Sequence, residues 1–181
     1  MTRRRTLTAT VLAVLAVAAA FAVDIPTKLV WNATASAPIG FYTIAPAGRL
    51  AVSELVAIMP PEPLAAFVVQ RGYVGDGVPL MKRVAGLPGQ QLCRTGRAIT
   101  VDGVEMGDAL DHDRIGRALP VWQGCRVIAD GQLFLMNWDV PDSLDGRYFG
   151  PIPASSVIGR ALPLLTDEEG DGRFVWRAPT H

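Results

Sequence analysis

The stretch from Gly77 to Gly89 reads Gly-Val-Pro-Leu-Met-Lys-Arg-Val-Ala-Gly-Leu-Pro-Gly, a short apolar run enclosed by glycine and proline. Glycine and proline favour turns, whereas a few apolar and β-branched residues between them are typical of a strand. We therefore predict a strand over residues 77–84.

Other short apolar runs with the same punctuation recur along the chain, at Leu55 to Met59, Ala98 to Val101, Leu133 to Met136 and Val157 to Leu162. No window after the N-terminal segment shows sustained helical periodicity. These patterns predict a body that is mostly β. The charged, glycine-containing stretch 107–117 is expected to be an exposed excursion from it.

The N-terminal segment differs in character from the body. Three arginines at positions 3–5 precede the run from Thr6 to Val23, which contains no charged residue. A helix of that length covers most of a bilayer core of about 30 Å. Because arginines stay on the cytoplasmic side, the chain from residue 24 onward would lie on the far side. We expect a single-pass transmembrane anchor, and a cleaved signal peptide is the alternative; both export the body.

The composition bounds the domain organisation and the partners. The chain has 181 residues, half of them hydrophobic, which suits one domain with appendages. Three of its 17 basic residues stand in the N-terminal cluster, so the rest carries 14 against 17 acidic residues. A mildly acidic body argues against nucleic acid as a partner. We predict an arginine cluster and anchor at 1–23, an exported domain at 24–166, and a mobile, acidic, glycine-rich tail at 167–181.

The two cysteines, Cys93 and Cys125, become informative if the body is exported. An oxidising compartment favours a disulfide between them, worth roughly 3 to 4 kcal/mol in the loop-entropy model. Two separate buried thiols are the alternative. Neither their spacing nor their neighbours indicate a metal site.

The residues that can act as a base are few. The histidines are His112, in a charged loop, and His181, the last residue, so a Ser/His/Asp triad is poorly supported. The lysines are Lys28 and Lys82, and Lys82 lies inside the apolar run described first. Apolar surroundings can lower the pKa of a lysine enough for it to act as a base. Alternatively, Lys82 is a strand-end lysine whose amine reaches water.

A candidate nucleophile is Ser36, in a stretch of small residues and turn formers from Thr34 to Gly40. Small neighbours allow a substrate backbone to approach a hydroxyl group closely. Taken alone, the pattern also fits an ordinary loop serine.

Three segments together resemble the signal peptidase I superfamily: Ser36 after the N-terminal segment, then Lys82 to Gly89, then Asp142 to Gly150. The resemblance implies small antiparallel sheets around an extended cleft, and a serine endopeptidase without cofactor or metal. It also implies that Ser36 is the nucleophile and Lys82 the general base.

The same resemblance gives roles to five more groups. The Thr34 hydroxyl and the Ser36 backbone N–H would form the oxyanion hole, and Ser143 would hold the Lys82 amine. Asp145 and Arg147 would form an ion pair that fixes the loop around Ser143. If the resemblance fails, that pair is an ordinary surface ion pair.

Details of the first segment resemble a narrower branch. The pattern Asn32, Thr34, Ser36, Pro38, Gly40, Tyr42 is similar to the TraF-type peptidases of conjugative transfer, which process pilin precursors and in some cases join the two pilin ends. In place of the usual Gly-Asp-Asn opening, the third segment is preceded by Asn-Trp-Asp at 137–139.

The sequence therefore predicts an inner-membrane pilin-processing peptidase with its catalytic domain in the periplasm, and cyclisation of the product is part of this hypothesis. Its partners would be a precursor protein, either a pilin or a secreted preprotein, and the lipid bilayer. Two alternatives are a general type I signal peptidase and a non-catalytic, membrane-tethered assembly protein of a pilus or secretion system.

Overall fold

The computed structural model describes residues 3–22 and 28–179. Its helices are α1 (Arg3–Ala22), α2 (Leu64–Gln70), α3 (Gly146–Phe149) and the 3₁₀ helix η1 (Ala154–Ser156). Its strands are β1 (Leu29–Asn32), β2 (Ile39–Ala45), β3 (Leu55–Ile58), β4 (Leu80–Gly86), β5 (Gln91–Thr95), β6 (Ala98–Val101), β7 (Val104–Asp108), β8 (Gly124–Val127), β9 (Gln132–Leu135), β10 (Ile152–Pro153), β11 (Val157–Asp167) and β12 (Val175–Trp176).

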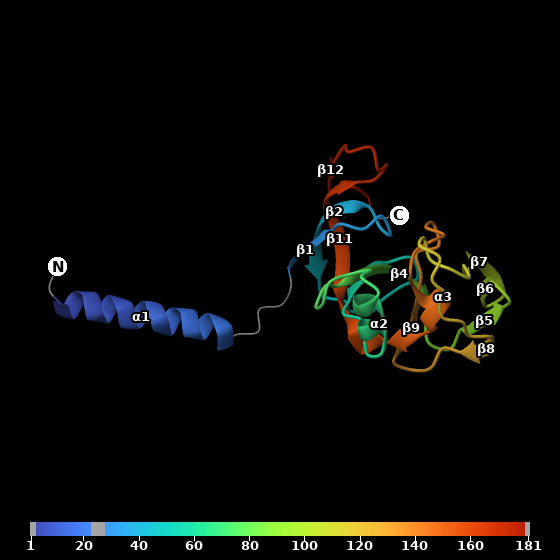
Figure 1. Cartoon of the computed structure of the whole chain (residues 1–181), viewed down its shortest axis with the longest axis horizontal. Helices are drawn as coiled ribbons and strands as arrows, with labels where there is room; N and C mark the ends of the chain where they lie inside the picture. Colours follow the sequence, from blue (N-terminus) through green and yellow to red (C-terminus); the bar gives the residue numbers. More distant parts are fainter. Residues whose placement is uncertain (1–2, 23–27, 180–181) are drawn as a thin grey trace.

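In the described residues these strands form two antiparallel sheets (Figure 1). The larger sheet has eight strands in the order β1-β2-β11-β3-β4-β9-β10, with β12 paired to β11. The smaller sheet has four strands in the order β7-β6-β5-β8. The prediction of a mostly β body built from antiparallel sheets is confirmed.

Strand β4, which carries Lys82, lies in the interior of the larger sheet between β3 and β9. In this register Lys82 lies opposite Val56, and Val84 lies opposite Leu135. Because side chains alternate along a strand, Lys82 and Val84 project to the same face. On that face Val56, Val84 and Leu135 belong to one buried apolar cluster. The lysine therefore emerges from the hydrophobic core.

The strands predicted at 55–59, 77–84, 98–101, 133–136 and 157–162 correspond to β3, β4, β6, β9 and β11. Helix α2 was not predicted. It has seven residues, which is too short to establish a helical period, and its buried residues Leu64 and Val68 belong to the same apolar cluster as Val56 and Val84.

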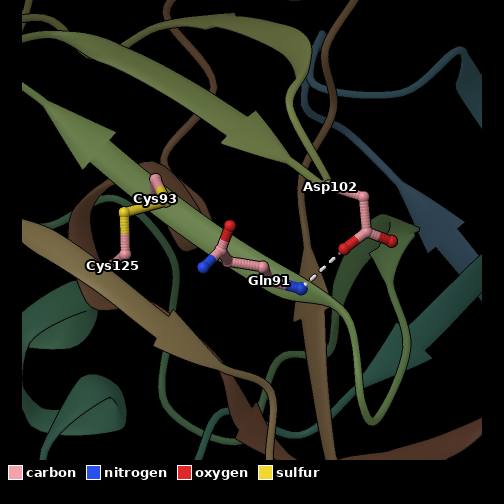
Figure 2. The surroundings of a disulfide bond; sticks show 4 residues. All are labelled: Gln91, Cys93, Asp102 and Cys125. Atoms are coloured by element: carbon pink, nitrogen blue, oxygen red, sulfur yellow. Dashed lines mark hydrogen bonds between the residues drawn. A yellow bond between two sulfur atoms is a disulfide. The ribbon is translucent and has the colours of Figure 1, made fainter.

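The smaller sheet contains the disulfide. Cys93 on β5 and Cys125 on β8 are direct cross-strand partners, and their sulfur atoms are bonded (Figure 2). Beside them the Gln91 N–H donates a hydrogen bond to the Asp102 carboxylate at 2.7 Å, which ties β5 to the turn after β6 (Figure 2). The predicted pairing of the cysteines is confirmed.

The N-terminal segment forms α1, whose described side chains from Arg4 to Leu15 are exposed. Among the described residues, no helix reaches the combination of length and apolarity that crossing a bilayer requires. The helix is thus present, and its transmembrane character stays a prediction. The predicted domain boundary at residues 23 and 24 lies outside the described residues.

The segment predicted to be a mobile tail contains β12. Thr166 pairs with Val175 and Leu165 with Trp176, so this part of the chain returns to the edge of β11. The final residues, 180 and 181, lie outside the described part of the chain.

Candidate active site

Ser36 lies in the turn that joins β1 to β2. The side chain of Asn32, at the end of β1, organises this turn. Its amide nitrogen donates to the carbonyl oxygens of Thr34, Ala37 and Pro38 at 2.9 to 3.1 Å. Its carbonyl oxygen accepts from the Thr34 N–H and hydroxyl. The buried amide thus replaces the ladder hydrogen bonds that the tight turn cannot make.

The residues after the turn hold it against the sheet. The Tyr42 hydroxyl donates to the Pro38 carbonyl oxygen at 2.7 Å. At Gly40, where φ is +149°, a Cβ would come within 2.2 Å of the Leu165 carbonyl oxygen on β11. These contacts give a physical reason for the pattern of Asn32, Pro38, Gly40 and Tyr42 around the serine.

The hydroxyl groups of Thr34 and Ser36 lie 2.9 Å apart. Because the Thr34 proton is donated to Asn32, the Ser36 hydroxyl is the donor in this pair. The Ser36 N–H has no protein acceptor within the described residues. It is therefore available to an oxyanion directly, whereas Thr34 must rotate its hydroxyl away from Asn32 to do the same.

The amine of Lys82 is buried, with 4% of the residue exposed. Its Nζ donates a hydrogen bond to the Ser143 hydroxyl at 2.9 Å. Leu80, Leu135 and Leu144 line the same small cavity as Lys82. The predicted contact between Lys82 and Ser143 is present.

Burial lowers the pKa of the Lys82 amine from its ordinary 10.5 to about 8, because an apolar environment disfavours the charged form. The Asp145 carboxylate acts in the opposite direction and Arg147 acts with burial. A substantial fraction of the amine is therefore neutral at mildly alkaline pH. A neutral amine can accept a proton, which an arginine at this position could not do.

Asp145 and Arg147 form a buried ion pair behind Ser143, with 5% and 1% of the residues exposed. The carboxylate accepts from the guanidinium at 2.8 and 2.9 Å and caps α3 by accepting from the Arg147 N–H. The guanidinium also donates to the carbonyl oxygens of Pro141, Val140 and Ser143. The pair therefore fixes the loop that presents the Ser143 hydroxyl, and an ordinary surface ion pair is excluded by its burial.

Gly146, between the two charged residues, allows this close packing. A Cβ at that position would lie 2.6 Å from the Leu135 carbonyl oxygen of β9. Any larger residue would push α3 away from the sheet and with it the ion pair.

Thr34, Ser36, Lys82 and Ser143 line one cavity of about 450 Å³. The end of α2 and the stretch 110–119, which includes most of the predicted excursion, line the same cavity. Two hydrogen bonds join these two parts, from Arg71 to the Ala118 carbonyl oxygen and from Arg117 to the Arg71 carbonyl oxygen. The excursion is thus a wall of the cavity, a role that its charged sequence did not indicate.

The structure brings the six predicted residues Thr34, Ser36, Lys82, Ser143, Asp145 and Arg147 into one region. Within the described residues no hydrogen bond joins Ser36 to Lys82. The Ser36 hydroxyl is bonded to the Thr34 hydroxyl, and the Lys82 amine to the Ser143 hydroxyl. The sequence reasoning missed the role of Asn137, whose side chain donates to the Ser36 carbonyl oxygen.

The site combines a serine hydroxyl with a buried lysine amine of lowered pKa on one cavity of a β-rich body. Comparison with known protein families shows to which of them a chain with this site belongs. The family model for signal peptidase, peptidase S26, matches residues 3–165, and the chain belongs to this family.

Relatives within the family place the chain in its TraF-type branch. It is 37% identical over 147 residues to the conjugal transfer protein TraF of Agrobacterium fabrum, covering 75% of this chain and 81% of that protein. It is 33% identical over 143 residues to a probable conjugal transfer protein TraF of Sinorhizobium fredii, covering 75% and 76%. A plasmid transfer protein TraF from Escherichia coli is 33% identical over 149 residues, covering 75% and 81%.

Among solved structures, a signal peptidase I from Enterococcus faecalis V583 aligns with a TM-score of 0.38 and 20% identity, over 63% of this chain and 97% of that chain. The family assignment rests on the sequence matches.

Proposed function

We propose that this chain is a serine endopeptidase in which Ser36 is the nucleophile and Lys82 the general base. The observation that carries the proposal is the buried Lys82 amine, held by Ser143 on the cavity that Ser36 also lines. Membership of the peptidase S26 family supports it.

In the proposed reaction Ser36 Oγ attacks the scissile carbonyl carbon as its proton passes to Lys82 Nζ. The Ser36 N–H and the Thr34 hydroxyl stabilise the oxyanion that forms. The protonated lysine then returns the proton to the leaving amine, and the acyl-enzyme on Ser36 remains. Before attack, the Ser36 hydroxyl has to turn from Thr34 toward the lysine.

The proposed substrate is a pilin precursor in conjugative transfer, bound in the cavity as an extended segment. The names of the relatives, conjugal or plasmid transfer protein, support the process. The proposal includes joining of the two pilin ends, because an amine held beside the acyl-enzyme can compete with water.

The proposed location is the inner membrane, with a single N-terminal span and the catalytic domain in the periplasm. Three arginines before a charge-free run support the orientation, and the Cys93–Cys125 disulfide supports an oxidising compartment. The exposed aromatic residues Trp31, Phe41 and Phe174 support contact with a membrane interface, where aromatic side chains are enriched. Trp31 packs on Phe41 and Phe174, with ring centroids 4.7 and 6.3 Å apart. Retention in the membrane pellet after carbonate washing tests the attachment.

The test of the chemistry is labelling of the full-length chain by a fluorophosphonate probe, which reacts with activated serines. Ser36→Ala, Lys82→Ala and Lys82→Arg should each abolish labelling, since the arginine keeps the charge but cannot be neutral. Ser155→Ala, at an exposed serine of η1, is the matched control and should label like the wild type. Labelling that survives Ser36→Ala or Lys82→Arg in folded protein contradicts the proposal.

The substrate is tested by offering a pilin precursor and a secreted preprotein side by side. Ser36-dependent cleavage of the pilin precursor alone supports the proposed function. Preference for the preprotein would indicate a general signal peptidase, and a probe-inert chain that still binds a pilus component would indicate an assembly protein.

A further inference from the structure

Ser36 and Lys82 lie on parts of the sheet that are not neighbours. The Ser36 turn joins β1 to β2, whereas Lys82 is on β4, and β11 and β3 lie between β2 and β4. Ladder hydrogen bonds of the sheet therefore do not set the separation of the hydroxyl and the amine directly. A small change in the curl of the sheet would change that separation, so a direct connection between the two segments is needed.

Asn137, just after β9, makes such a connection. Its side-chain nitrogen donates both to the Ser36 carbonyl oxygen and to the Met81 carbonyl oxygen, the latter at 3.1 Å. Its side-chain oxygen accepts from the Arg83 N–H at 3.0 Å. The side chain thus holds the peptide groups on both sides of Lys82 and the peptide group of Ser36 at once.

The backbone of Asn137 is itself fixed. Its N–H donates to the Asp145 carboxylate at 3.0 Å, and its carbonyl oxygen accepts from Arg147 at 3.2 Å. The residue is 4% exposed, so these hydrogen bonds are made away from bulk water. One residue therefore joins the turn of Ser36, the strand of Lys82 and the ion pair behind Ser143.

The three side-chain contacts require an amide. Asparagine offers two N–H donors and a carbonyl acceptor on a short stem, and all are used here. An aspartate of the same shape would keep the acceptor for Arg83 but would turn a second oxygen toward two carbonyl oxygens. An alanine would leave one buried and two part-buried backbone groups without these partners.

We propose that Asn137 is the positioning residue that fixes the Ser36 turn against the Lys82 strand. It thereby sets the separation of the hydroxyl and the amine on their common cavity. This inference rests on the proposed function, because it assigns a role in the Ser36/Lys82 reaction. Asn137 itself does not contact the reacting atoms.

The test compares Asn137→Ala and Asn137→Asp with Val101→Ala, a truncation on β6 in the apolar cluster that packs the smaller sheet against β4 and β9. For each full-length variant, fluorophosphonate labelling is measured from pH 6 to 10 below the unfolding temperature, and thermal unfolding is measured in parallel. Because misplacement by about 1 Å can slow a reaction by 10²-fold, both Asn137 variants should label at least roughly tenfold more slowly than Val101→Ala.

A second readout separates positioning from simple loss of stability. A loosened Ser36 turn admits water to the lysine, so the midpoint of the alkaline rise in labelling should move upward in Asn137→Ala and stay in place in Val101→Ala. If Asn137→Ala does not fold, Asn137→Asp carries the comparison of labelling rates on the alkaline plateau, since it keeps the shape and one hydrogen bond.

Labelling rates within twofold of Val101→Ala, with an unmoved midpoint, overturn the positioning role while leaving the proposed function intact. Wild-type labelling that does not depend on Ser36 overturns the proposed function, and the positioning role with it. The wild-type and Asn137 results therefore distinguish the two failures.

Discussion

The Lys82 amine and the Ser143 hydroxyl are joined by a 2.9 Å hydrogen bond inside the protein, at the meeting point of a central strand and a loop pinned by a buried ion pair. Ser143 can accept from the amine in either of its protonation states. It therefore orients Lys82 without forcing it to stay charged, in contrast to a carboxylate at that place.

The first prediction concerns pH. With the pKa of Lys82 near 8, about a tenth of the amine is neutral at pH 7 and about nine tenths at pH 9. Because the neutral form is the base, activity should rise roughly tenfold over that range and level off above it. Initial rates of probe labelling or peptide cleavage measure this rise. A flat profile from pH 6 to 9 is incompatible with Lys82 as the base.

The second prediction concerns the oxyanion hole. Thr34→Val keeps the shape of the side chain and removes its hydroxyl, whereas Thr34→Ser retains a donor. Loss of one such donor typically lowers kcat by 10² to 10³, so the valine variant should fall by about that factor and the serine variant should stay active. Equal kcat values for the two variants would place Thr34 outside the reaction.

Some of this site could be predicted from sequence because its signals are local. The apolar, punctuated runs indicated β3, β4 and β6, and the position of Lys82 within such a run made a buried amine one of two interpretations, of which the structure has the buried one. The connection through Asn137 could not be predicted in this way. Its partners are backbone groups of residues 36, 81 and 83, which lie 101, 56 and 54 positions away and carry no side-chain signature.

The third prediction concerns the disulfide. Alkylation without reductant should label neither Cys93 nor Cys125 in denatured protein taken from cells, because the two sulfur atoms are bonded. The variant Cys93→Ser/Cys125→Ser should unfold at a lower denaturant concentration, because its free energy of unfolding falls by roughly 3 to 4 kcal/mol in the loop-entropy model. It should still label at Ser36. Quantitative alkylation of both cysteines would contradict the bond in the cell.

The fourth prediction concerns the ion pair behind Ser143. Asp145→Asn keeps the shape but leaves the Arg147 guanidinium buried without its counter-charge, which should cost about 3 to 5 kcal/mol in the free energy of unfolding. The same substitution at an exposed pair, Asp171→Asn beside Arg173, is the control and should leave the denaturation midpoint nearly unchanged. Similar effects of the two substitutions on urea unfolding would show that the buried pair does not fix the loop.

The last prediction concerns what resolves the acyl-enzyme. Water at the Ser36 ester gives a trimmed linear pilin, whereas the pilin's own N-terminal amine gives a new peptide bond and a circular chain. Residues of the stretch 110–119 and the end of α2 line the same cavity of about 450 Å³ as Ser36. A second chain segment held in this cavity would have a high effective concentration at the ester, and this can outweigh the abundance of water. We therefore expect a circular product from the cognate pilin precursor.

Intact mass measures this product, because the circular chain is lighter than the trimmed linear chain by one water. Blocking the pilin N-terminus by acetylation is the control and should leave the linear product alone. If the unblocked precursor also yields the linear mass alone, the chain is a plain endopeptidase, and the Ser36/Lys82 chemistry stands without the joining step.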